Sequence, residues 1–367
     1  MDPIAHTLAG ATLAQTRLKH LTPLATATLV IGANLPDIDA VITFLGNDAS
    51  LYYRRGITHG IAAMVILPLL LTAAMMAYDR FWRRRNSEKT PVDPRGLLIL
   101  SYIGVLSHPL LDWLNTYGVR LLMPFDGRWF YGDTLFILDA WMWLLMAAAV
   151  VFAYSQRRLS RGIWIVLGIL LSALVTLAPM VPLGAKVVWW IGVATITALR
   201  IRGVEPAENQ RIAFGCVVAF ALYVAAMTAG NELADRDVRA WLMEEEQAQV
   251  MELMTGPVPA NPFRREVVAV SDTHYYGLEV RFFGDTPIRH RYPPAPLPEL
   301  DPIVERALEM EEVRGFANWM RFPTFEVIDE ETRYKVVIRD LRYAAPDDPP
   351  DAPGIGVTTV YVDQEPP

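Results

Sequence analysis

Residues 61–78 read IAAMVILPLLLTAAMMAY, a run without a charged side chain. A helix needs about 20 apolar residues to cross the hydrocarbon core of a bilayer. Runs of similar character follow at residues 97–114, 136–154, 163–181, 187–199 and 212–230. They lack the polar stripe that a helix of a soluble protein keeps. The sequence therefore predicts a mainly α protein whose residues 61–230 form about six transmembrane helices.

The bulk composition agrees with a membrane protein, because 53% of the residues are hydrophobic and the mean hydropathy is +0.24. The net charge of −7 is unevenly distributed, with acidic residues gathered after Asn231. A basic stripe with interleaved aromatic residues is missing, so no nucleic acid is expected as a partner. The single cysteine, Cys216, lies in an apolar run and cannot form an intrachain disulfide. The N-terminal sequence does not predict a cleaved signal peptide.

The basic residues predict the orientation of the helices. Arginines and lysines gather in the loops after the first, third and fifth runs, at residues 80–95, 157–161 and 200–211. Loops rich in these residues stay in the cytoplasm. A multi-pass protein of the cytoplasmic (inner) membrane is therefore expected, in contact with membrane lipids and with residues 231–367 outside the cytoplasm.

The segments on either side of the long runs predict two further parts. Within residues 1–60, Thr7–Thr16 and Pro23–Ala33 are each too short to cross a bilayer, which indicates a re-entrant or short helical hairpin. Residues 231–367 are expected to form a small soluble α+β domain. Its predicted helices are Glu232–Met254, ended by Gly256-Pro257, and Pro302–Trp319. Its predicted strands are Glu266–Ser271, Tyr275–Phe283, Thr324–Ile328 and Tyr334–Leu341, with a short strand at Val357–Val362 and a turn at Asp329–Glu331.

The sharpest chemical motif is SHPLLDW at residues 107–113. His108 and Asp112 are four residues apart, so on a helix they share one face and can approach one metal ion together. Imidazole and carboxylate are ligands that divalent metals prefer. The alternative is a buried histidine that is hydrogen-bonded to its helical neighbour without a metal.

Two more motifs carry residues of the same chemistry. In NLPDID at residues 34–39, Asp37 and Asp39 can face one cation, or act as one ligand and one general base. They can equally cap a helix. In RRGITH at residues 54–59, His59 would be a ligand, and Arg54 or Arg55 would clamp an anionic substrate oxygen. The alternative makes these arginines interface anchors.

The predicted topology adds His6 and Asp139 to the candidates. Each falls on the same outer side as Asp37, His59 and the 108–112 motif, although the orientation rests on arginine and lysine alone. Asp139 can be a ligand or can orient a ligating histidine. Ionisable groups within apolar segments are costly and usually paired, which favours one shared site.

These motifs together resemble the membrane-bound metal-dependent hydrolases of bacteria and archaea, an inner-membrane family of uncharacterised substrate. The resemblance covers roughly residues 1–145 and is carried by His6, Asp37-Ile-Asp39, Arg54–His59, His108–Asp112 with Asn115, and Gly132-Asp133 with Asp139. The His-x-x-x-Asp spacing is also distantly similar to the zinc-dependent phospholipase C and P1 nuclease pattern. The further histidines and the glutamate of those enzymes are not found here.

The expected function is metal-dependent hydrolysis of a phosphoester or lipid-derived substrate at the outer membrane face. A divalent ion, zinc or otherwise manganese or magnesium, would activate a water molecule. We expect His59, His108 and Asp112 to bind it, with His6 and Asp37 completing the site or binding a second ion. Asp39 would take the water proton. The alternatives are a transporter or proton relay, and a non-enzymatic scaffold that presents the outer domain.

Overall fold

The structure is a computed structural model that describes residues 1–85, 88–352 and 354–364. The chain divides into two compact units. The first contains residues 1–38, 55–229 and 257–262, and the second contains residues 39–54, 230–256 and the chain from residue 263 onward. The change at residue 230 coincides with the predicted start of the C-terminal domain. Residues 39–54, in contrast, group with the second unit although they belong to the N-terminal part of the sequence.

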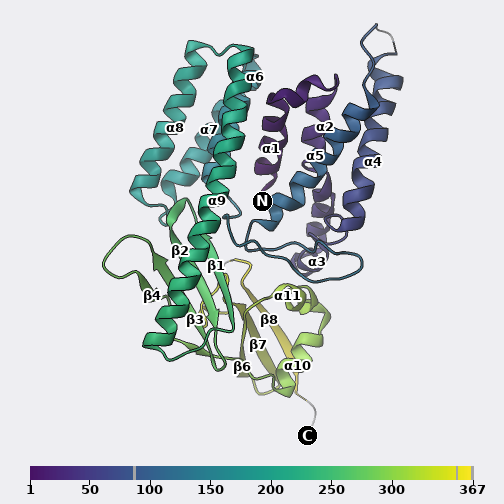
Figure 1. Cartoon of the computed structure of the whole chain (residues 1–367). Helices are drawn as coiled ribbons and strands as arrows, with labels where there is room; N and C mark the ends of the chain where they lie inside the picture. Colours follow the sequence, from purple (N-terminus) through teal and green to yellow (C-terminus); the bar gives the residue numbers. More distant parts are fainter. Residues whose placement is uncertain (86–87, 353, 365–367) are drawn as a thin grey trace. The chain divides into compact units, whose positions relative to one another are not determined.

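The first unit is helical (Figure 1). Its described helices are α1 (Pro3–Gln15), α2 (Ala25–Gly32), α4 (Ile61–Tyr78), α5 (Pro94–Trp113), α6 (Ala140–Tyr154), α7 (Arg158–Leu177), α8 (Leu183–Arg202) and α9 (Pro206–Glu245), which continues into the second unit. The 3₁₀ helix η2 (Leu35–Leu45) follows α2, and the π-helical turn η3 (Asp79–Arg83) follows α4.

Among the described helices, 6 are long and apolar enough to cross a membrane. The predicted mainly helical fold is thus confirmed, but the set of helices differs from the predicted set. The segment Ala25–Leu45 belongs to it, because the helical run continues through η2 instead of ending at Ala33. The helix α6 is only 15 residues long, because Asp139 caps its first turn and ends the predicted run 136–154 on that side.

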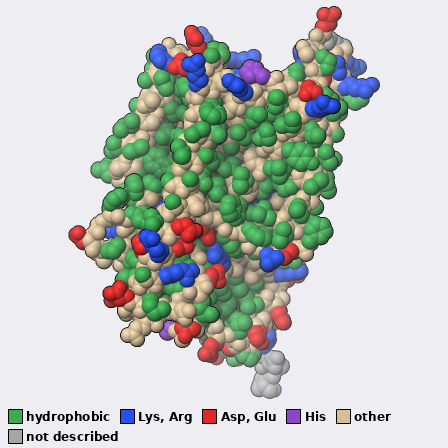
Figure 2. All heavy atoms as spheres, in the orientation of Figure 1, with side chains coloured by type: hydrophobic (Ala, Val, Ile, Leu, Met, Phe, Trp, Pro, Cys, Tyr) green, Lys and Arg blue, Asp and Glu red, His purple; other side chains and the backbone are tan. Residues whose placement is uncertain are grey.

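The outer surfaces of these helices are apolar. The helices α7 and α8 bury few of their side chains, and large hydrophobic side chains such as Ile169 and Ile191 are well exposed. Figure 2 shows hydrophobic side chains covering the helices, with Lys and Arg side chains gathered toward the loop ends. A soluble protein rarely exposes an apolar surface this large, so these faces suit contact with lipid.

Close backbone packing holds α2 against α5. A Cβ atom on Gly104 would lie 3.2 Å from the Cα atom of Gly32 and 3.1 Å from the backbone oxygen of Leu29. Glycine at both positions therefore lets the two helices approach closely. This approach brings the end of α2 beside the last turns of α5, where His108 and Asp112 lie.

The second unit contains two sheets. One has 5 strands, in the order β1 (Glu252–Val258), β2 (Asn261–Val270), β3 (His274–Arg281) and β4 (Ile288–His290), with β5 (Ala295–Pro296) also paired to β3. The other is antiparallel, in the order β6 (Pro323–Asp329), β7 (Arg333–Asp340) and β8 (Val357–Asp363). The predicted strands and the turn at Asp329–Glu331 are confirmed.

The two predicted helices of this unit are only partly correct. The helix α9 ends at Glu245, Gln247 takes a left-handed φ of 52°, and residues 252–254 already belong to β1. The Gly256-Pro257 pair lies within that strand and does not end a helix. The predicted helix Pro302–Trp319 is divided into α10 (Pro302–Glu309), a 3₁₀ turn and α11 (Arg314–Trp319), because Met310 is extended.

The segment at residues 39–54 joins the second unit through α3 (Asn47–Tyr53). The N-cap residue of α11, Val313, makes no side-chain hydrogen bond to the helix. Instead, Asp48 Oδ1 accepts hydrogen bonds from the backbone N–H groups of Gly315 (2.7 Å) and Phe316 (3.0 Å). The segment is thereby fixed to α11. Its position bears on the site because residues 39–54 connect Asp37 to His59 along the chain.

Candidate metal centre

The helix α5 supplies two of the candidate ligands. His108 and Asp112 lie one turn apart on the same face, and both are buried. Pro109 sits inside α5 without ending it. The predicted i, i+4 pair is therefore present, near the end of a helix long enough to cross a membrane.

His59 reaches the same place from the turn before α4. The backbone there approaches the loop after residue 120 closely, since Ile61 donates to the Leu121 oxygen at 2.8 Å. A Cβ atom on Gly60 would lie 2.2 Å from the Met123 oxygen. Only glycine fits this close approach, and it fixes the position of the adjacent His59.

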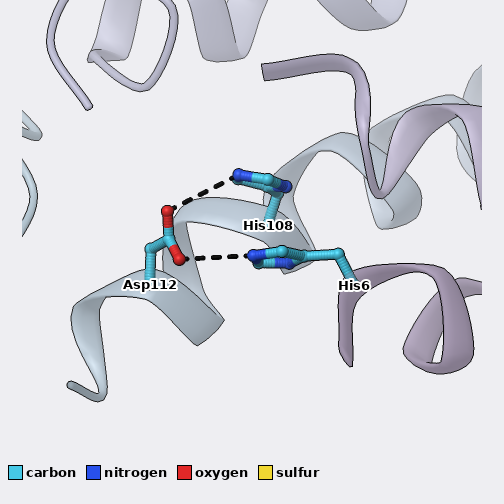
Figure 3. Close-up of side chains that lie close together, drawn as sticks. All are labelled: His6, His108 and Asp112. Carbon is cyan, nitrogen blue, oxygen red and sulfur yellow. Dashed lines mark hydrogen bonds and ion pairs between the residues drawn. The ribbon is translucent and has the colours of Figure 1, made fainter. Parts of the chain in front are cut away.

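Two further candidates come from η2 and α1. Asp37 lies in the first turn of η2, and His6 is fully buried in α1. Asp2 caps α1 by accepting from the Ala5 N–H group at 3.0 Å and also accepts from the Trp143 indole at 3.0 Å. The start of α1 is thereby tied to α6. Figure 3 shows His6 and His108 both directed at Asp112.

Three candidate ligand atoms form a compact triangle. The Nε2 atoms of His59 and His108 are 3.1 Å apart, and Asp112 Oδ2 lies 3.4 and 3.5 Å from them. Ligands placed tetrahedrally around Zn²⁺ at about 2.0–2.1 Å are separated by about 3.3–3.4 Å. Ordinary N–H···O hydrogen bonds measure 2.7–3.2 Å, so the nitrogen–oxygen distances fit shared coordination better than direct hydrogen bonds.

Asp37 lies close to the two imidazole nitrogens of the triangle. Its Oδ1 atom is 3.7 Å from His108 Nε2 and 4.0 Å from His59 Nε2. These distances exceed the ideal tetrahedral edge by less than 1 Å, which a small movement of the carboxylate would close. Asp37, His59 and His108 form one group with metal-ligand spacing, and His6, His108 and Asp112 form another.

Hydrogen bonds hold the imidazoles in the orientation that ligation requires. The Nδ1 atom of His108 lies 2.7 Å from the Ala33 carbonyl oxygen. Since a carbonyl only accepts, His108 Nδ1 donates, and the neutral ring presents its Nε2 lone pair to the site. Thr58 Oγ1 lies 2.9 Å from His59 Nδ1 and can hold that ring in the same manner.

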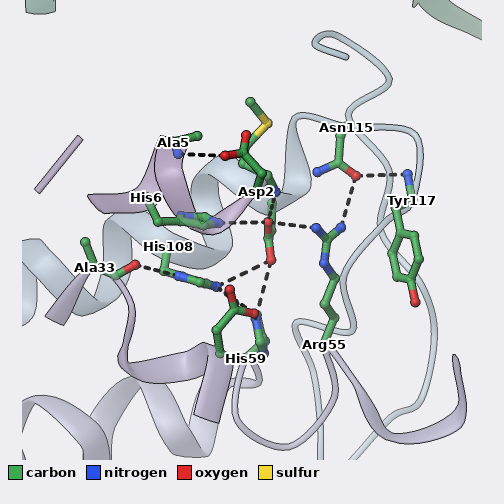
Figure 4. Close-up of polar contacts among 12 residues, drawn as sticks. Asp2, Ala5, His6, Ala33, Arg55, His59, His108, Asn115 and Tyr117 are labelled. Atoms are coloured by element: carbon green, nitrogen blue, oxygen red, sulfur yellow. Dashed lines mark hydrogen bonds and ion pairs between the residues drawn. The ribbon is translucent and has the colours of Figure 1, made fainter. Parts of the chain in front are cut away.

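The two oxygens of Asp112 face different partners. While Oδ2 faces His59 and His108, Oδ1 faces Arg55 Nη2 at 3.0 Å, His6 Nε2 at 3.2 Å and the N-terminal amine of Met1 (Figure 4). The His6 ring also stacks on His108 with centroids 3.7 Å apart. His6 therefore lies next to the ligand triangle on its Oδ1 side.

Arg55 braces the site from within the protein and is buried. Besides Asp112, its guanidinium donates to Asn115 Oδ1 at 3.0 Å and to the Gly118 carbonyl at 3.1 Å. Its carbon Cζ lies 4.5 Å from the centre of the Tyr117 ring. The structure thus gives Arg55 a role in holding Asp112, whereas the sequence predicts a clamp for substrate at Arg54 or Arg55.

Three predicted residues are not brought into either ligand group. Asp39 and Arg54 belong to the second unit, where Arg54 Nε lies 4.0 Å from Asp39 Oδ1. Asp139 caps α6, with Oδ1 accepting from the Met142 N–H group at 2.8 Å and Oδ2 from the Tyr223 hydroxyl at 3.0 Å. Both of its oxygens thus serve the packing of helices, which explains a buried carboxylate without a metal.

Several partners of the site are not evident in the sequence. The Ala33 carbonyl and the N-terminal amine are backbone groups, and no pattern of side chains marks them. Thr58 precedes His59 directly, but the sequence suggests only a helix cap there. Asn115 follows the 108–112 motif closely, but nothing in the sequence pairs it with Arg55, which is 60 residues away.

Comparisons with known proteins agree with a membrane protein. Residues 1–181 match the model of a family described as YdjM inner membrane protein. The chain is also 22% identical over 317 residues to the uncharacterized protein YfhP of Bacillus subtilis (strain 168), covering 86% of this chain and 76% of that protein. No solved structure matches the chain. The matched family segment includes every candidate ligand, and these descriptions name no hydrolase activity.

Proposed function

We propose that the chain is a membrane-embedded, metal-dependent hydrolase that acts on a phosphoester of a lipid-derived substrate. The observation that carries this proposal is the triangle of His59, His108 and Asp112, whose ligand atoms are spaced as around one zinc ion. Asp37 supplies the fourth ligand or leaves that position to water. Manganese and magnesium are the alternatives to zinc, although two imidazoles favour zinc.

A bound zinc ion would lower the pKa of a coordinated water to about 7 and polarise a phosphoryl oxygen. The chain's own residues prepare that chemistry. Ala33 and Thr58 orient the two imidazoles, and Arg55 holds Asp112 with its Oδ2 atom toward them. Because Arg55 is already engaged, charge on the substrate has to be stabilised mainly by the metal.

The location of the site supports a lipid-derived substrate. Asp112 is the penultimate residue of α5, a helix long enough to cross a membrane, so the centre lies near one end of the span. A molecule anchored in the bilayer reaches such a site by lateral diffusion. The basic loops favour the outer side of the membrane for this end and for residues 231–367, which a reporter fused after the last residue can test.

The test combines metal content with hydrolysis. The full-length protein in detergent is analysed for zinc, manganese and magnesium, together with Asp112→Asn and His59→Ala. Asp126→Asn serves as the control, because Asp126 is a loop carboxylate that pairs with Arg128 outside the site. Phosphate release is then measured from phosphatidic acid in mixed micelles and from glycerol 3-phosphate.

We expect one ion per chain in the wild type and in Asp126→Asn, and its loss in the two site variants. Phosphatidic acid should be hydrolysed faster than the water-soluble ester. Failure of any divalent ion to bind would refute the metal centre. Stoichiometric metal without hydrolysis of either ester would refute the assigned reaction while leaving the centre in place.

A further inference from the structure

A groove lies along α6, α7 and α8, on a part of the first unit that does not contain the metal-ligand triangle. Its volume is about 440 Å³. The walls are mostly aliphatic and include four indoles, those of Trp143, Trp164, Trp189 and Trp190. Trp190 and the neighbouring Ile165 are about half exposed, so the groove opens on the apolar outer surface.

One end of the groove is basic. Arg161, in the first turn of α7, and Arg200, in the last turn of α8, both line it. Both also reach the C-terminal end of α6, where Arg200 Nη2 donates to the Ser155 carbonyl at 3.0 Å and Arg161 Nη2 donates to the Gln156 carbonyl at 3.4 Å. Arg161 Nε also lies 3.5 Å from the Ser155 oxygen, so both guanidiniums donate to that one carbonyl.

These cations are not neutralised by the chain. Within the described ranges, no carboxylate forms an ion pair with Arg161 or Arg200, and the Nη1 group of each donates no hydrogen bond. Two adjacent side chains, Arg157 and Arg158, add positive charge nearby. A phosphate group is the ligand that such paired guanidinium donors recognise.

The length of the groove matches one leaflet of a bilayer. The lining residues extend from Trp143 in α6 to its C-cap residue Ser155, which is about 18 Å at 1.5 Å per residue. Half of the ~30 Å hydrocarbon core is about 15 Å. A ligand that fits has a phosphate at one end and an acyl chain of leaflet length, and basic pockets between transmembrane helices are known to hold such lipids.

We propose that this groove is a binding site for an anionic glycerophospholipid, with its phosphate at Arg161 and Arg200 and one acyl chain along the indoles. The site is separate from the hydrolytic centre and does not depend on it. The lipid would fill a groove that α6, α7 and α8 leave open and would join the three helices.

Two pairs of variants separate the headgroup from the chain. Arg161→Gln with Arg200→Gln removes the proposed phosphate ligands, and Arg157→Gln with Arg158→Gln is the charge-matched control. Gly168→Phe fills the groove, since Gly168 lines it and a Cβ atom there would meet nothing within 4 Å. Gly162→Phe is the control on the same helix, because Gly162 has equal space but does not line the groove.

Binding is measured by native mass spectrometry of the full-length protein in detergent, titrated with phosphatidylglycerol or phosphatidylcholine of identical chains. We expect one phosphatidylglycerol to bind at least tenfold more tightly than phosphatidylcholine. The preference should vanish in the Arg161/Arg200 variant, and both lipids should be lost from Gly168→Phe, while the two controls bind as the wild type does. Equal binding of the two lipids, or unchanged binding by Gly168→Phe, would overturn the proposal.

A soluble phosphate ligand gives a different result. Glycerol 3-phosphate at millimolar concentration should not displace phosphatidylglycerol, because it lacks the chain that occupies the groove. Full displacement would show that the two arginines bind free phosphate and that no lipid site exists. Melting temperatures without lipid, measured for every variant, identify any that fails to fold, in which case the single variants Arg161→Gln and Arg200→Gln, or Gly168→Leu, replace it.

Discussion

Replacing Asp112 by Asn should both destabilise the metal-free protein and abolish metal binding. Arg55 Nη2 lies 3.0 Å from Asp112 Oδ1, and both residues are buried. At an effective dielectric constant of about 20, a unit ion pair at this distance is worth about 5.5 kcal/mol before desolvation. Removing one partner of a buried pair typically costs 3–5 kcal/mol. Since Asn keeps an oxygen that can accept from Arg55, we expect a loss of about 3 kcal/mol.

The assay is denaturation of the detergent-solubilised protein, with chelator and with zinc. Arg55→Met and the double variant complete a double-mutant cycle. The stability lost in the double variant should be smaller than the sum of the two single losses by at least 1 kcal/mol, as is typical of residues in contact. Zinc at 100 times its Kd should stabilise the wild type by about 2.7 kcal/mol and leave Asp112→Asn unchanged. Strict additivity would refute the buried ion pair, and normal stabilisation of Asp112→Asn by zinc would refute its role as a ligand.

Three further tests distinguish ligation from support. Asp139→Ala should cost about 1 kcal/mol through loss of the α6 cap while zinc stoichiometry stays at the wild-type value; loss of zinc would return this residue to the ligand set. Gly60→Ala should weaken zinc binding at least tenfold, because its Cβ atom meets a backbone oxygen and displaces the adjacent His59. The control Gly127→Ala, which has open space around it, should bind zinc as the wild type does. Isothermal titration calorimetry measures the zinc affinity of both variants. Asp48→Ala removes the cap of α11 and Asp301→Ala removes the cap of α10, each worth about 1 kcal/mol. Only Asp48→Ala should also weaken zinc binding, since only Asp48 fixes the segment between Asp37 and His59. Equal zinc affinities in the two variants would contradict this link.

The helical part of the fold was predictable because lipid removes most alternatives. A long apolar run can satisfy its backbone only as a helix, so the boundaries of α4 follow directly from the sequence. The length of α6 was not predictable in the same way. A capping Asp139 shortens the helix, and hydropathy does not distinguish a cap from a residue inside a span.

The centre of the site was predictable from two kinds of signal. The spacing of His108 and Asp112 places them on one helical face, and the basic loops place His6, Asp37 and His59 on the same side. Neither signal separates a ligand from a supporting residue. Asp139 is buried for reasons of capping, and its second partner, Tyr223, is 84 residues away.

The different positions of Arg54 and Arg55 could not be predicted from the sequence. The two residues are adjacent and chemically identical, yet Arg55 belongs to the first unit and Arg54 to the second. Arg55 adopts a left-handed φ of 53°, which changes the direction of the chain between them. No propensity of arginine predicts that conformation, since non-glycine residues seldom adopt it. It follows from the tertiary contacts of Arg55 with Asp112 and Asn115.

The inserted segment gives the second unit a physical connection to the site. Asp37 and His59 are separated along the chain by residues 39–54, which group with the second unit and are tied by Asp48 to α11. A free linker of this length would leave the two candidate ligands to sample many separations, and ordering it would cost conformational entropy. Anchoring the linker reduces the conformations open to it, and a centre whose ligands are held in advance loses less entropy when it binds metal. If the centre binds metal as proposed, the C-terminal domain would contribute to metal affinity through this chain segment, without donating a ligand.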